Sequence, residues 1–490
     1  MSATLTPAAS RLGVRAAPVA VVLLGPVALA FAKGGYYPEA RWWAGLVAWA
    51  LVALAAARAP VALPRGVAGR IAVAALAGLT VWTALGLTWA PLSIPAVAAL
   101  QRDVVYLGAF LAAAAWLRGR AGDWVEPAVC AGALVVVGFA LAERWLPGLV
   151  ELARSKTAAG RLEQPYTYSN AMGALAALGW VLAVRLAADP RRAPGLQAAA
   201  AAAGVPLALG LWLSFSRGAL AAALAGLAVL VLLTPVRRQV WAAVVAMLVA
   251  MPVIVAAVLL PGITELGRSL DVREAAGAGL LAVTGLSAAV AALAARRLGQ
   301  RGDADRRLGL TWRRALLGVA LLGVLGLGVA VVAAERRGGS TPRYGATVSR
   351  FGSADSLRYE YWRVAVAEWR DAPLRGGGPG SFEAAWLRER RVDDTVHQAH
   401  SLYLQTLAEL GVVGLALLAA FLAALGAAGR RAWRSRPATA AGPVAALVVF
   451  FVHAGLDWDW EMPALTLVAM GLAGTLVALA EREDVSEPAG

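Results

Sequence analysis

Histidine, arginine and glycine gather in one long polar stretch, residues 335–400, of a chain that is otherwise built from apolar segments. This stretch contains Arg358, a glycine-rich turn at 375–381 and the sequence His397-Gln-Ala-His400. Histidine accepts a proton more readily near neutral pH than any other side chain, and arginine favours an anionic partner. Chemistry is therefore expected here first.

The two histidines stand directly before an apolar segment that starts near Ser401. A position at a helix start tends to keep histidine neutral and hence basic. We interpret His400 as a candidate base, while a helix cap remains the ordinary alternative for either histidine. A metal site built from His397, His400, Asp393 and Asp394 is a weaker alternative, because the spacing matches no known zinc pattern.

Arg217 occupies a turn of about four residues, 214–217, between two apolar segments. A charge at or just below a membrane interface usually indicates an anionic partner. The alternative is that the side chain extends to the lipid phosphates.

Arg161 lies just before the apolar segment that starts near residue 169. Tyr166 and Tyr168 stand nearby for stacking on a sugar, and Asn170 is a candidate helix cap. A simple ion pair between Arg161 and Glu163 is the alternative.

Residues 355–370 have apolar side chains at four-residue spacing and predict an amphipathic helix on the outer surface. Arg358 falls in its first turn, where the helix dipole disfavours a cation unless an anion lies nearby. The glycines at 376–378 and 380 suit either a plain tight turn or backbone amides that hold a phosphate.

Composition places these residues in a membrane protein. The 490 residues are 60% hydrophobic, with a mean hydropathy of +0.67. The single cysteine, Cys130, is expected in the core. Apolar runs long enough to cross about 30 Å of hydrocarbon recur along the chain. About fourteen spans are predicted, near 16–33, 42–57, 70–88, 103–117, 124–142, 169–187, 195–213, 218–234, 240–260, 274–295, 315–334, 401–427, 440–456 and 462–480.

The basic residues predict the orientation, because Lys and Arg of short loops collect on the cytoplasmic side. With a cytoplasmic N-terminus, about 24 of the 45 basic residues fall inside, against about 10 in short outer loops. Both termini are then cytoplasmic, and the polar stretches 143–168, 214–217, 335–400 and 457–461 face outward. This distribution accounts for the net charge of +15 without a nucleic-acid partner.

The predicted fold is therefore an all-α polytopic membrane protein of about 12–14 transmembrane helices with one long extracytoplasmic loop. We predict a helical bundle in residues 1–334, a catalytic loop in 335–400, further spans in 401–480 and a cytoplasmic tail in 481–490.

The order of motifs resembles the O-antigen ligase and polymerase superfamily of bacterial membrane glycosyltransferases. Two departures are Ser401, where the family often has Asn, and the span count, since about twelve spans are usual. The motifs that carry the resemblance are Gly160-Arg161…Asn170, Ser214-x-Ser-Arg217-Gly-Ala, Arg358-x-x-x-Trp362, Pro373-Leu-x-Gly-x-Gly-x-Gly380-Ser-Phe382, His397-x-x-His400-Ser-x-x-Leu404, Glu409-Leu-Gly-x-x-Gly414 and His453…Asp457.

The resemblance implies a fold similar to GT-C glycosyltransferases and a polyprenyl-diphosphate-linked glycan as donor. It also implies transfer on the outer face of the cytoplasmic membrane, without a metal, a nucleotide sugar or another cofactor. A glycan or lipid-linked glycan would be the acceptor, and the family name points to lipopolysaccharide. The implied roles are diphosphate binding for Arg161, Arg217 and Arg358, a base in His400, and acceptor binding or orientation for Asp457, His397 and Tyr168.

Two other functions stay open at this point. A polymerase that joins lipid-linked repeat units needs the same arginines and the same base as a ligase. An exporter or flippase of lipid-linked sugar would also have twelve to fourteen spans. Against the exporter, the sequence has no evident internal repeat and few charges deep in its spans.

Overall fold

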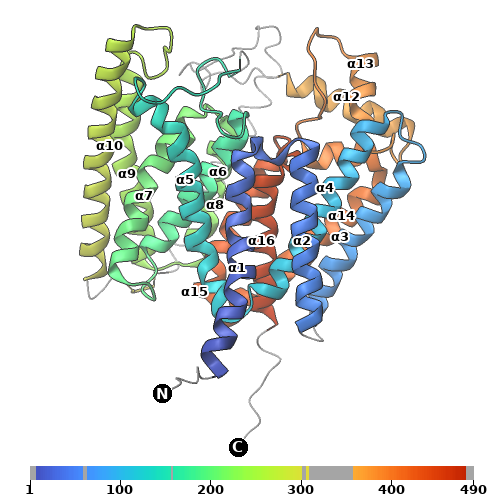
Figure 1. The fold of residues 1–490 in the computed structure, drawn as a ribbon, viewed down its shortest axis with the longest axis horizontal. Helices are drawn as coiled ribbons and strands as arrows, with labels where there is room; N and C mark the ends of the chain where they lie inside the picture. The colour runs from blue at the N-terminus through green and yellow to red at the C-terminus, as the bar shows by residue number, and fades with distance from the viewer. Residues whose placement is uncertain are drawn as a thin grey trace, which may run out of the picture.

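The computed structural model describes residues 7–58, 63–155, 158–300, 305–307, 309 and 357–481, with side chains from residue 16 onward. The regular secondary structure of these ranges is helical, with no β-strand and only one isolated bridge between Val236 and Arg307. The predicted all-α class is confirmed (Figure 1).

Eleven helices in the described ranges are long and apolar enough to cross a membrane, and α8 and the apolar part of α1 are shorter. Helices suit this setting because all of their backbone hydrogen bonds are internal. Each of these spanning helices coincides with a predicted span. The remaining predicted span, 315–334, lies outside the described residues. The bundle consists of α1 (Pro7–Phe31), α2 (Pro38–Arg58), α3 (Val67–Gly86), α4 (Ser93–Trp116), α5 (Val125–Trp145), α6 (Ser169–Ala187), α7 (Pro194–Leu213), α8 (Arg217–Leu233), α9 (Arg237–Leu259), α10 (Leu270–Gly299), α14 (Leu402–Ser435), α15 (Pro437–Ala454) and α16 (Pro463–Ala480).

The helix α6 forms the centre of the bundle, because every one of its residues is buried. Its sequence is rich in alanine and glycine, which lets neighbouring backbones approach closely. The peripheral helices α2 and α9 expose most of their apolar surface instead. On α2, the indoles of Trp42 and Trp43 are exposed.

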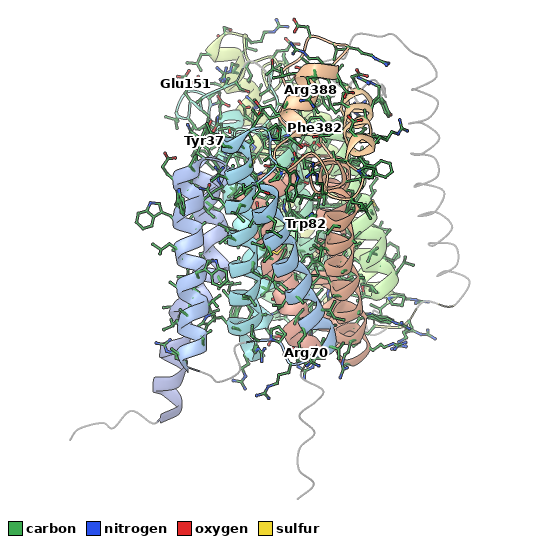
Figure 2. All side chains as sticks on the ribbon, turned by 90° about the vertical axis from the view of Figure 1, so that its right-hand side faces the viewer. Tyr37, Arg70, Trp82, Glu151, Phe382 and Arg388 are labelled. Carbon is green, nitrogen blue, oxygen red and sulfur yellow. The ribbon has the colours of Figure 1, made fainter. Side chains whose placement is uncertain are left out.

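The two ends of the bundle differ in chemistry. One end carries arginines of the predicted cytoplasmic loops, and ion pairs such as Arg118–Glu481 (3.1 Å) and Arg192–Glu126 (3.9 Å) connect its elements. The other end carries α12 (Arg358–Asp371) and α13 (Phe382–Glu389). Figure 2 shows the separation, with Arg70 at the lower end and Arg388 at the upper end.

The helix α12 confirms the amphipathic helix predicted near 355–370. It buries Tyr361, Val364 and Ala365 in a small core that it shares with Phe382 and Trp386 of α13. This core packs against the start of α14 and fixes the α12–α13 segment to the end of the bundle.

The glycine-rich turn locks the same segment onto α14. The long helix breaks at Gly411 (φ 65°, ψ −166°), and the N–H of Val412 donates to the carbonyl of Pro373 at 2.9 Å. In return, the amides of Gly377 and Gly378 donate to the carbonyls of Ala408 and Glu409 at 2.9 and 2.8 Å. The helix break thus provides the partners that hold the turn.

We expect Gly411→Ala to destabilise the fold by roughly 2 kcal/mol or more, because these dihedral angles are essentially restricted to glycine. An added Cβ would also overlap the carbonyl of Leu374. Gly426→Ala on the same helix is the matched control, since open space surrounds that position. Unfolding is measured by heating the protein with a fluorescent maleimide, which labels the buried thiol of Cys130 only once that thiol becomes exposed. Equal melting temperatures for both variants would contradict this interpretation of the break.

Candidate functional site

The carboxylate of Asp457 joins three distant parts of the chain at the end of the bundle that carries α12 and α13. It lies in the turn between α15 and α16 and is 1% exposed. The hydroxyl of Tyr168 donates to Oδ1 at 2.6 Å, the Asn170 amide donates to Oδ2 at 2.7 Å, and Arg358 forms an ion pair with Oδ2. A buried carboxylate requires such partners, because an unpaired charge is costly away from water.

These partners also determine the charge of Asp457. Burial alone would raise the pKa of this carboxyl, but the positive charge of Arg358 and two nearby histidines lowers it to about 2. Asp457 is therefore an anion at neutral pH. Arg358 is the first residue of α12, where the helix dipole disfavours a cation unless an anion lies nearby. Asp457 is that anion.

Arg161 is held in the same cluster by two contacts. Its Nε donates to the carbonyl of Ser214 at 2.7 Å, and its guanidinium donates to the side-chain oxygen of Asn170. The amide of Asn170 thus bridges Arg161 and Asp457. The predicted cap role of Asn170 is wrong, because α6 starts at Ser169 and has no side-chain cap. The alternative Arg161–Glu163 pair is not formed either, since Glu163 accepts from Ser155.

His400 lies beside this cluster in a fixed orientation. Its Nδ1 donates to the carbonyl of Gln398 at 3.0 Å, which leaves Nε2 as the proton acceptor of the neutral ring. The ring lies 5.0 Å from the Tyr361 ring and 6.4 Å, edge to face, from Trp458. Ser401, not a histidine, caps α14 through its hydroxyl.

The environment of His400 favours the neutral ring. Burial lowers the pKa of this histidine, the charge of Arg358 lowers it further, and Asp457 acts in the opposite direction. The net shift is downward, so the imidazole is unprotonated and able to accept a proton at neutral pH.

Arg217 lies at the adjoining helix start. The predicted turn between two spans is confirmed, because α7 ends at Leu213 and α8 begins at Arg217. The preceding residue, Ser216, caps α8 and lies 3.4 Å from the ring of His453. Arg217 itself is half-buried at the end of the bundle that holds Asp457.

His453 and Asp459 form a buried pair that the sequence analysis did not single out as a site. The Nδ1 of His453 bonds to a carboxylate oxygen of Asp459, and its Nε2 faces Ser216. Burial raises the pKa of Asp459, and His453 opposes that shift. The signal was present, since this is one of only three histidines and lies inside an apolar span.

His397 lies apart from the cluster. It pairs with Glu383 of α13 at 2.9 Å, and its side chain is 51% exposed. The nearby acids also have other partners, since Asp394 accepts from Tyr361 at 2.7 Å and Asp393 pairs with Arg390 at 3.6 Å. Within the described ranges, no group of three or more His, Cys, Asp or Glu residues is arranged to hold a metal ion.

The glycine-rich turn is a plain tight turn and not a binding site for a phosphate. The amide of Gly380 donates to the Glu409 carboxylate at 2.8 Å, and the amides of Gly377 and Gly378 bond to backbone carbonyls. These three amides are engaged by the protein itself, so they do not form a phosphate cradle.

Of the residues singled out from the sequence, Tyr168, Arg161, Arg358 and Asp457 form one cluster, His400 lies beside it, Arg217 lies on the adjoining turn and His397 lies outside. Strained backbone accompanies the cluster: positive φ angles occur at Thr167 (63°), Phe215 (48°) and His400 (52°). Such conformations cost about 1–3 kcal/mol for non-glycine residues and tend to occur at functional sites.

A family model described as O-antigen ligase matches residues 275–419, a region that includes Arg358 and His400. A comparison with curated proteins found no match. The family match agrees with the motifs and with the membrane-spanning fold. The match over residues 275–419 supports the resemblance of this chain to the O-antigen ligase and polymerase superfamily.

Proposed function

We propose that this membrane protein transfers a glycan from a polyprenyl-diphosphate donor to an acceptor hydroxyl on the outer face of the cytoplasmic membrane. The observation that carries the proposal is the Asp457 cluster, which holds two arginines beside a neutral histidine. The match to the O-antigen ligase family model supports glycan transfer as the class of reaction.

The donor requires stabilisation of negative charge. When the bond between the anomeric carbon and the diphosphate breaks, the electron pair stays with the departing polyprenyl diphosphate. Arg161, Arg217 and Arg358 stabilise this anion, because guanidinium groups match phosphate oxygens in both charge and geometry. Asn170 and the Ser214 carbonyl hold Arg161 in place, so this guanidinium is oriented before the donor arrives.

The acceptor requires a base, because an alcohol is a weak nucleophile until its proton is removed. The acceptor oxygen attacks the anomeric carbon, and its proton moves to Nε2 of His400. Asp457 stabilises the imidazolium that forms, since its negative charge raises the pKa of His400. Tyr168 and Asn170 hold that carboxylate in position.

A polymerase would use the same groups, with a second lipid-linked repeat unit as acceptor. The acceptor distinguishes the two activities, and lipopolysaccharide is the acceptor that the family name suggests. Neither step requires a metal or another cofactor in this mechanism.

We expect His400→Ala to lower kcat by about 10²–10⁴, the contribution of a positioned base. His397→Ala is the matched control, because that ring lies outside the cluster and should leave kcat close to wild type. The assay uses purified protein in nanodiscs, a synthetic polyprenyl-diphosphate oligosaccharide and an acceptor. Full activity of His400→Ala would rule out the assigned base.

The transfer rate, plotted against pH, should show a single decrease, on the acid side. Because the His400 pKa is shifted below its ordinary value of about 6.5, the rate should stay constant around pH 7 and fall only as acid protonates the ring. His400→Ala should lose this decrease. A decrease centred above pH 7 in the wild type would contradict a lowered pKa.

Direct attack inverts the anomeric centre. NMR coupling constants of the new glycosidic bond, compared with those of the donor, measure the configuration. We expect inversion, whereas retention would indicate a covalent intermediate or another two-step route.

The proposed orientation places α12 on the outer side of the cytoplasmic membrane. In a Cys130→Ala background, Leu374→Cys is exposed at the end of the bundle that holds the cluster, and Arg70→Cys is exposed at the opposite end. A membrane-impermeant maleimide should label only the first in intact spheroplasts. Labelling of Arg70→Cys alone would reverse the proposed orientation.

A further inference from the structure

A second polar pocket adjoins the Asp457 cluster. It opens to solvent, and α3, α4, the first turns of α14 and the turn 457–461 line it. Arg102 in its wall lies nine residues into α4, roughly 13 Å along the helix from its start. Arg102 is 7% exposed, and a buried ionisable side chain in a bundle of spanning helices is costly and usually functional.

The wall of this pocket is a network of charged and amide groups. Arg102 forms a buried ion pair with Glu461, and the amide of Gln405 donates to the same carboxylate at 3.1 Å. Asp103 accepts from Thr83 at 2.7 Å. These bonds fix the wall before any ligand enters.

The network leaves polar atoms unsatisfied. Among the described residues, the Nε of Arg102 and the Oε1 of Glu409 have no hydrogen-bond partner, although both side chains are more than nine-tenths buried and both residues line the pocket. Such atoms cost about 1–3 kcal/mol each unless a ligand or water satisfies them. One donor and one acceptor are what the hydroxyl groups of a sugar can satisfy.

Aromatic side chains complete the pocket. Trp458 and Trp460 line it, and the flat apolar face of an indole suits a sugar ring, whose hydroxyls remain available for polar partners. Trp458 also contacts Tyr168, with ring centroids 4.3 Å apart and ring planes tilted by 38°, and lies edge-on to His400. The same indole therefore separates the pocket from the Asp457 cluster.

We propose that this pocket binds a sugar ring of the acceptor glycan and presents its hydroxyl to His400. The assignment to the acceptor rests on the proposed function and on position. His400 directly precedes the turns of α14 that line the pocket, whereas Arg161 contacts Asn170 and Ser214 on the side of α6 and α7.

The test fills the pocket without changing its charges. Ala99 of α4 lines it, so Ala99→Phe should block a sugar, and Ala98→Phe on the neighbouring face of the helix is the matched control. Thr406→Val removes one hydroxyl from the wall at almost constant volume. We expect the acceptor KM to rise at least tenfold for Ala99→Phe and severalfold for Thr406→Val, with the donor KM unchanged.

A binding measurement separates this inference from the proposed reaction. Saturation-transfer NMR of a fixed panel of hexose, N-acetylhexosamine and heptose disaccharides should detect binding to wild type, to His400→Ala and to Ala98→Phe, and its loss in Ala99→Phe. Absence of binding by the whole panel, or binding unaffected by Ala99→Phe, overturns the pocket assignment. A rise in donor KM instead of acceptor KM overturns its assignment to the acceptor. Loss of the transfer reaction alone would count against the proposed function and leave the binding result to decide this inference.

Discussion

The buried charge of Asp457 is the constraint on which the rest of the site depends. A carboxylate that is 1% exposed at the end of a membrane bundle must be paired, and its partners come from the start of α6 and the start of α12. Pairing therefore draws the α12 segment onto the bundle. The same charge opposes the effect of burial on His400 and favours an imidazolium when one forms.

The turn between α15 and α16 contains three acidic residues within five positions, and each of them is paired. Asp457 is bound by α6 and α12, Asp459 pairs with His453, and Glu461 pairs with Arg102 of α4. The spacing Asp457-Trp-Asp459 looks formally like a metal motif, yet the two carboxylates have different partners. The turn thus works as a junction between helices, and the proposed donor and acceptor sites lie on opposite sides of Trp458.

Hydropathy could predict the spans because a helix in hydrocarbon must be continuous and apolar whatever its neighbours are. The span predicted at 169–187 matches α6 residue for residue, and the one at 218–234 differs from α8 by a single residue at each end. Side-chain pairing was harder to predict from the sequence. Asn170 meets Asp457 across 287 positions of sequence, and no local pattern distinguishes this bridge from the helix cap that was expected. His453 itself stood out as a histidine in an apolar span, but nothing in the sequence indicated its partners Ser216 and Asp459.

The central claim is that separate groups at the same end of the bundle bind the diphosphate and accept the proton. Native mass spectrometry of purified protein with a polyprenyl diphosphate that lacks a glycan tests this separation without any transfer step. We expect His400→Ala to bind within about twofold of wild type, and Arg161→Gln, Arg217→Gln and Arg358→Gln each to bind at least about tenfold more weakly. Arginine variants that bind as wild type does, or a loss of binding confined to His400→Ala, would contradict the claim.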